Sequence, residues 1–225
     1  MTVQEFIEQN IDLIDDNRYE TLYLNMANQV QRQRSIGRLT DFLLKAEINP
    51  LDYLNTIPDF YLAESKIKEY VIPNNIRIIG DFAFFMCENI NVISIPDSII
   101  SIGQFAFKEC KSLNKIKFPK QLKTIEEHMC ADNRFLNEII FPEDLEVIGH
   151  AAFLNCNYLS SIKLPKTIKF ISTAAFMNCP ITDIYYEGTK DEWHEFIKEN
   201  NHHWVRSNQT YTVHCSDGDY MRYGI

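Results

Sequence analysis

The middle of the chain repeats one pattern of apolar residues and prolines every 23 residues. Five segments align without a gap from Ile72 onward. Their prolines are Pro73, Pro96, Pro119, Pro142 and Pro165, and a second column contains Ile79, Ile102, Ile125, Ile148 and Ile171. One such unit has too few apolar residues to enclose a core, whereas stacked units share a continuous one. The pattern therefore predicts a solenoid of five repeats over residues 72–186.

Within each repeat, a short strand is expected to end near the proline, because proline cannot donate a hydrogen bond to a neighbouring strand. Gly80, Gly103 and Gly149 share one column, which we interpret as a backbone conformation that is costly for residues with a Cβ. The last repeat is one residue shorter and reaches the final isoleucine column early, at Ile184, which marks the end of the array.

The third repeat departs from the pattern. Met129 and Cys130 replace an Ala-Phe pair, Asn133 replaces the usual cysteine, and Glu126 replaces the glycine. A larger residue in one column and a smaller residue in the next roughly conserve core volume. We expect this repeat to be distorted or specialised.

The recurring phrase Ile-Gly-x-x-Ala-Phe-x-x-Cys-x-x-Leu-x-x-Ile-x-Ile-Pro, which Ile102–Pro119 fits well, resembles the BspA-type leucine-rich repeat family. The resemblance covers residues 72–186. It implies a right-handed leucine-rich repeat solenoid of short parallel strands and turns, in the mixed α/β class, that usually serves binding. Family members include bacterial surface adhesins, and similar arrays occur in phage proteins. The resemblance implies no catalytic residues.

Three other regions flank the array. Helical spacing of apolar residues predicts a small all-α N-terminal domain over residues 1–55. Residues 56–71 reproduce only the closing half of a repeat and are expected to cap its first face, with Phe60 and Leu62 pointing inward. Residues 187–225 are expected to form the C-terminal cap, with a helix that begins at a Thr189–Glu192 capping box and an edge strand over 210–214. Such a segment resembles the usual end of the family's arrays.

Composition narrows the function classes. The chain of 225 residues is 45% hydrophobic and 24% charged, with a net charge of −9. This acidic balance disfavours nucleic acid, and the basic residues at 32–38 are interpreted as a helix surface. The acidic N-terminus is unlike a signal peptide, and no apolar run is long enough to span a membrane, so we expect a cytoplasmic protein without membrane contact.

Candidate chemical groups favour structural roles. Five of the six cysteines fall at related positions in the array and are expected to be reduced core residues. A histidine-rich C-terminal stretch lacks metal-ligand spacing, and it contains His194, His202, His203 and His214 beside Cys215. His128 and His150 are close in repeat register but have no nucleophile at a motif spacing. Without a phosphate loop or a nucleophile motif, we predict no catalytic residue, no metal site and no cofactor.

The surface that remains free for binding is the strand face of the solenoid. Outward positions before each proline change in charge and size between repeats, and the candidate contact residues are Lys115, Lys117, Glu138, Ile140, Ser161, Lys163 and Tyr185. The opposite turn carries apolar residues that the repeat does not require, namely Phe85, Phe135, Leu154, Tyr158 and Met177. Half of these are expected to meet the helical domain or the caps.

The sequence therefore predicts a non-enzymatic protein–protein interaction module whose partner it does not identify. A phage or mobile element is a candidate source, in which case the protein would bind a host or viral protein in the host cytoplasm. The N-terminal helices are candidates for homo-oligomerisation. One alternative is a structural or adhesive surface component, and another is a metal-dependent enzyme that uses the histidine-rich C-terminal stretch.

Overall fold

The computed structural model describes residues 55–200, 203–206 and 209–222. Apart from residue 55, the predicted helical domain over 1–55 lies outside the described residues, and so do the basic residues at 32–38. The homo-oligomerisation predicted for these helices therefore stays a prediction. Within the described residues, no helix is long and apolar enough to cross a bilayer.

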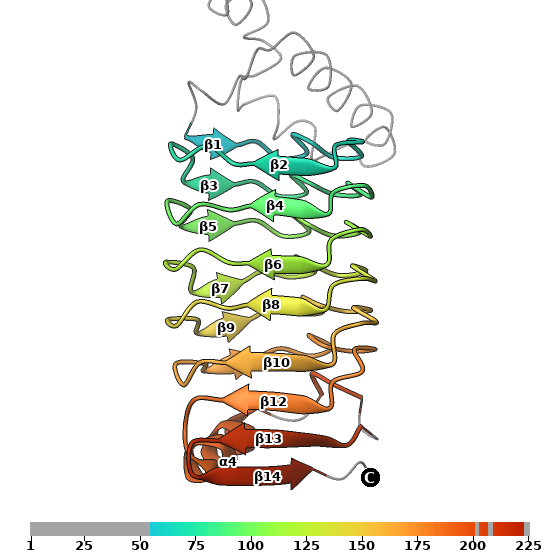
Figure 1. The fold of residues 1–225 in the computed structure, drawn as a ribbon. Helices are drawn as coiled ribbons and strands as arrows, with labels where there is room; N and C mark the ends of the chain where they lie inside the picture. The colour runs from blue at the N-terminus through green and yellow to red at the C-terminus, as the bar shows by residue number, and fades with distance from the viewer. Residues whose placement is uncertain (1–54, 201–202, 207–208, 223–225) are drawn as a thin grey trace, which may run out of the picture.

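The array is a β-solenoid of about six turns over residues 56–186, which confirms the predicted solenoid and contains one turn more than the five repeats expected over 72–186. Each turn contributes strands to two rows, which Figure 1 shows stacked along the molecule. One row contains the two-residue strands β1 (Thr56–Ile57), β3 (Ile78–Ile79), β5 (Ser101–Ile102), β7 (Thr124–Ile125), β9 (Val147–Ile148) and β11 (Phe170–Ile171). The other contains β2 (Glu69–Val71), β4 (Val92–Ser94), β6 (Lys115–Lys117), β8 (Glu138–Ile140), β10 (Ser161–Leu164) and β12 (Asp183–Tyr186).

Parallel pairing keeps equivalent positions of successive repeats in register. Ile79 pairs with Ile102 between β3 and β5, and Ile125 pairs with Ile148 between β7 and β9. In the second row, Ile116 of β6 pairs with Ile139 of β8. These side chains are buried, so the isoleucine columns form continuous ladders through one core. Repeats of fixed length keep the ladders aligned because a one-residue slip would turn them to the surface.

Residues 56–71 supply an opening strand as well as the closing half that the sequence indicated. β1 pairs in parallel with β3, which places Ile57 beside Ile79 in the buried ladder. Leu62 is fully buried, whereas Phe60 is half-buried and stacks on Phe82 with ring centroids 4.7 Å apart. This segment therefore forms the first turn of the solenoid.

The core of the third repeat is rebuilt around a small residue. Phe84 stacks on Phe107, and Phe153 on Phe176, each with ring centroids 5.2 Å apart, while Cys130 occupies the position between the two pairs. Two rings at the position before the proline reach Phe153 edge-on, Phe118 at 6.4 Å and Phe141 at 5.7 Å. Their bulk, with that of buried Met129, restores the volume that Cys130 leaves, in line with the expected exchange.

The glycine column has a different cause from the one that the sequence suggested. Among the described glycines, only Gly218 has a positive φ. A Cβ on Gly103 would lie 2.2 Å from Oδ1 of Asp81 and 2.6 Å from its backbone nitrogen. The column is therefore glycine because the preceding turn approaches the backbone closely, and the conformational interpretation was wrong.

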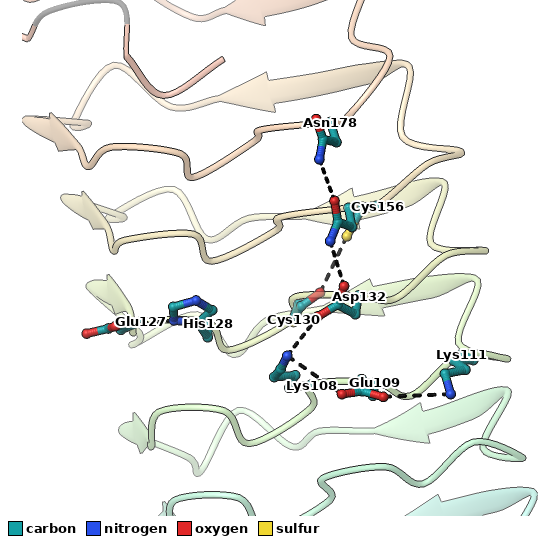
Figure 2. Close-up of polar contacts among 10 residues, drawn as sticks. Lys108, Glu109, Lys111, Glu127, His128, Cys130, Asp132, Cys156 and Asn178 are labelled. Atoms are coloured by element: carbon teal, nitrogen blue, oxygen red, sulfur yellow. Dashed lines mark hydrogen bonds and ion pairs between the residues drawn. The ribbon is translucent and has the colours of Figure 1, made fainter. Parts of the chain in front are cut away.

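A ladder of polar side chains links the turns along one side of the array (Figure 2). Lys108 Nζ donates to Asp132 at 2.7 Å, Asn155 Nδ2 donates to Asp132 Oδ1 at 2.7 Å, and Asn178 Nδ2 donates to Asn155 Oδ1 at 2.6 Å. Arg206 ends the ladder by donating to Asn178 Oδ1 through Nε and a terminal nitrogen. Because the ladder crosses successive turns, it opposes their separation.

The C-terminal cap covers the last turn. Helix α4 (Lys190–Glu199) begins at the predicted capping box, which is present in both directions between Thr189 and Glu192. Its Trp193 is fully buried. β13 (Tyr211–Cys215) pairs in parallel with β12, and β14 (Gly218–Arg222) pairs antiparallel with β13. The strand expected to be the edge is therefore internal, and β14 is the edge.

Candidate protein-binding surface

The structure places all seven predicted contact residues on one exposed face, along β6, β8, β10 and β12. They form two columns on either side of the buried isoleucine ladder. The first column contains Lys115, Glu138 and Ser161, and the second contains Lys117, Ile140, Lys163 and Tyr185. Backbone pairing sets Lys115 opposite Glu138, Lys117 opposite Ile140, and Lys163 opposite Tyr185. The sequence thus located this face correctly, while its binding role stays a prediction.

Several charges on this face are paired within the protein. Lys115 Nζ lies 2.7 Å from Glu138 Oε1, and Lys163 Nζ lies 2.8 Å from Glu187 Oε1. The bond to Glu187 raises the pKa of Lys163. Because all four side chains are well exposed, each pair contributes little stability, and a partner can replace its contacts at small cost.

At the C-terminal end of the face, His214 of β13 lies between two carboxylates. Its Nε2 is 2.8 Å from Asp183 Oδ1, its Nδ1 is 3.0 Å from Asp219 Oδ1, and its ring stacks on Tyr185 at 4.7 Å. Carboxylates only accept hydrogen bonds, so both ring nitrogens must donate and the imidazolium form is favoured. The bond to Asp183 therefore raises the pKa of His214, and the same bond lowers that of Asp183.

Apolar side chains interrupt the charged positions of the strand face. Ile140 is 37% exposed and Tyr185 is 48% exposed, and both are predicted contact residues. Val71 of β2 and Val92 of β4 are still more exposed, and neither is among the predicted contact residues. The signal was present, since both occupy outward positions of the same two columns.

The opposite turn is less continuous as an apolar surface. Phe135 and Tyr158 are exposed and lie against each other, with ring centroids 5.4 Å apart. Phe85, Leu154 and Met177 are half-buried within the described part of the solenoid, and Phe85 packs edge-on against Phe82. The five residues predicted there therefore divide into one exposed aromatic pair and three partly packed side chains.

The five array cysteines are buried, as predicted. Four donate their thiol hydrogen to a backbone carbonyl of the preceding turn, as Cys87 does to Leu62 at 2.9 Å and Cys179 to Phe153 at 3.0 Å. Burial raises the pKa of Cys110 and Cys156 well above the usual thiol value, which keeps both protonated at neutral pH. These thiols therefore act as core residues that also bond one turn to the next.

The described histidines of the C-terminal stretch have separate surroundings. His194 packs edge-on against Tyr220, His203 accepts a bond from the backbone of Ala174 through its carbonyl, and His214 is held by the two aspartates. In the described residues, three metal-ligating groups converge instead at Glu127, His128 and His150, a cluster that the spacing of these residues in the sequence did not indicate.

Comparison with known proteins agrees with the observed architecture. A sequence profile for the BspA-type leucine-rich repeat region matches residues 55–186 in six copies. Among solved structures, a leucine-rich repeat protein of T. pallidum has a TM-score of 0.54 at 30% identity, over 58% of this chain and 62% of that protein. One from Bacteroides ovatus has a TM-score of 0.53 at 22% identity, over 62% and 48%.

The chain thus spans less than two thirds of either neighbour. No curated protein matches it at a significant level. The family match covers more than half of the chain and includes every turn of the solenoid. The chain therefore belongs to the BspA-type leucine-rich repeat family.

Proposed function

We propose that this protein is a non-enzymatic module that binds another protein through the strand face of its solenoid. The observation that carries the proposal is the contrast between the two sides of each strand. Inward positions repeat almost unchanged, whereas outward positions run through lysine, glutamate, serine, isoleucine and tyrosine. Core packing accounts for the first set and not for the second, and leucine-rich repeat arrays in general suggest protein binding.

The composition of the face suggests how a partner would be held. Ile140 and Tyr185 offer apolar area near the middle and the C-terminal end of the array, and aromatic side chains commonly supply much of the binding energy at interfaces. Lys115 and Lys163 add charges to the same face that are already paired within the protein, which favours specificity over affinity. We expect a partner with an apolar patch and a polar rim.

The cytoplasmic location and the phage or mobile-element origin stay proposals on the sequence grounds given above. The absence of enzymatic activity is likewise a proposal, and it is supported by the typically non-enzymatic character of the repeat family. The alternative, a structural or adhesive surface component, predicts that affinity capture would retain cell-envelope material and not a soluble partner.

Affinity capture from the native cell, followed by mass spectrometry, tests the proposal. The variant Ile140→Ser with Tyr185→Ala removes apolar area from the strand face. The matched control, Ile78→Ser with Phe170→Ala, removes exposed apolar area of similar extent from the other strand row. We expect one soluble partner that the strand-face variant loses and the control keeps.

Loss of that partner in the control alone would place binding on the other row and contradict the proposal. Retention of cell-envelope material by the wild-type chain would favour the adhesive alternative. Thermal melting of both variants checks that the face, and not the fold, was changed.

A further inference from the structure

The third and fourth repeats bring together three side chains of the kinds that bind transition metals. Glu127 and His128 come from the turn after β7, and His150 comes from the equivalent turn after β9. One ligand atom from each lies within 4.8 Å of the other two. The backbone N–H of His128 donates to the carbonyl of His150 at 2.9 Å, so a main-chain bond holds the two residues side by side.

The repeat uses these positions differently elsewhere. In the first turn of the solenoid, the side chain of Asp59 accepts from the backbone N–H of Asp81 at 2.8 Å, and in the second turn the side chain of Asp81 does the same for Gln104. Glu127 and His150 occupy the equivalent positions of later turns, and neither caps a backbone N–H of the next turn in the described structure. Their side chains are therefore available to each other.

His128 takes the place of a phenylalanine. Phe60, Phe82 and Phe105 stack in succession, and the imidazole of His128 continues the stack on Phe105 at 4.9 Å and 6°. His150 meets the other side of the ring at 5.4 Å and 70°. Neighbours on both sides thus fix the orientation of the imidazole, which reduces the entropy lost when it binds a ligand.

The contact between Glu127 and His128 has the spacing of two ligands of one ion (Figure 2). Nδ1 of His128 is buried, and Oε1 of Glu127 lies 3.2 Å from it. Tetrahedral zinc with bonds of 2.0–2.1 Å sets its ligand atoms about 3.3 Å apart.

We propose that Glu127, His128 and His150 bind a divalent transition metal ion, zinc in the first instance, and leave its fourth position to solvent. His150 is exposed, so its side chain has room to rotate towards the ion. The nearby positive charge of Lys108 is offset by Asp132 at 2.7 Å and Glu109 at 3.6 Å. The bound ion links two successive turns at the repeat that departs furthest from the pattern. This departs from the expectation of no metal site.

Zinc titration by calorimetry on the tag-free full chain, first dialysed against EDTA, tests the proposal. We expect one zinc ion per chain, and a melting temperature that zinc raises. Glu127→Gln and His150→Ala should each weaken zinc binding at least tenfold without changing the melting temperature in EDTA, since both side chains are at the surface. Cobalt substitution should give the intense visible absorption of a four-coordinate site.

His194→Gln is the matched control, because it removes an exposed histidine from the C-terminal helix and should bind zinc as the wild type does. Failure of the wild-type chain to bind one equivalent would overturn the proposal, as would undiminished binding by His150→Ala or loss of binding in the control. The result is independent of partner capture, so either proposal can fail while the other stands.

Discussion

Replacing Asn133 with cysteine should stabilise the protein. Asn133 is fully buried at the cysteine position of the third repeat, and both Oδ1 and Nδ2 of its side chain lack a hydrogen-bond partner. At the same position of neighbouring turns, the thiol of Cys110 donates to the carbonyl of Phe84 at 3.1 Å, and that of Cys156 to the carbonyl of Cys130 at 3.4 Å. A cysteine at 133 would face the equivalent carbonyl, that of Phe107.

The expected gain follows from the desolvation of the amide. A buried polar group without a partner costs about 1–3 kcal/mol, and cysteine removes this cost while it adds a weak S–H bond. A slightly smaller side chain gives back part of the gain through looser packing. We therefore expect Asn133→Cys to raise the free energy of unfolding by about 2 kcal/mol, or the melting temperature by about 4–8 °C for a chain of this size.

Urea unfolding under reducing conditions, followed by circular dichroism, measures the effect. The midpoint should rise while the slope stays constant, which separates a change in stability from a change in the unfolded state. Cys110→Asn is the reciprocal control, since it introduces the same amide into a regular repeat and should destabilise the protein by a similar amount. An unchanged or lower midpoint for Asn133→Cys would show that the amide is satisfied in solution, and would refute the reasoning.

Two further predictions concern the cap and the core. His214→Asn should reduce the pH dependence of stability at the C-terminal hairpin. Because the pKa of His214 is raised in the folded protein, its bonds to Asp183 and Asp219 stabilise the fold fully below about pH 6.5. This stabilisation is lost as the pH rises through the folded pKa. Amide exchange of β13 and β14 against pH checks this, and an identical profile in the variant would contradict it. Phe153→Ala should cost about 3–5 kcal/mol by leaving a cavity between the rings of Phe176, Phe118 and Phe141. Exposed Phe170→Ala, the control, should stay within about 0.5 kcal/mol of the wild type by urea unfolding.

The regular part of the fold could be predicted because each repeat presents the same apolar spacing. A fixed length of 23 residues aligns Ile79 with Ile102, whereas a one-residue slip would turn one strand's isoleucine to the surface. The same alignment predicted which side chains point outward, so Lys117 and Ile140 were correctly assigned to one face. Periodicity carries this information since the fold is itself periodic.

Contacts that depend on how closely two turns approach could not be predicted. The glycine at 103 is required by the carboxylate and backbone of Asp81, a neighbour that only the stacked structure reveals. The cluster at Glu127, His128 and His150 is similar, since its two histidines lie 22 residues apart and match no local metal motif. The repeat register placed them in adjacent columns, and that was the available signal.

The departures in the third repeat have two kinds of physical consequence. Met129 and Cys130 exchange volume with Phe118 and Phe141, so the core remains closed. Asn133 has no such compensation. Because a central repeat contacts both of its neighbours, the buried amide of Asn133 should weaken both interfaces.

His128 likewise interrupts a stack of phenylalanines without improving it as packing. Residues that break a local rule without a packing gain are expected at functional sites, because selection for function is what retains them. A stabilising Asn133→Cys variant together with a zinc site at His128 would show that this repeat has exchanged stability for binding. Stabilisation without zinc binding would mean that the buried amide of Asn133 only destabilises the fold, and that the isoleucine ladders of the neighbouring repeats compensate for it.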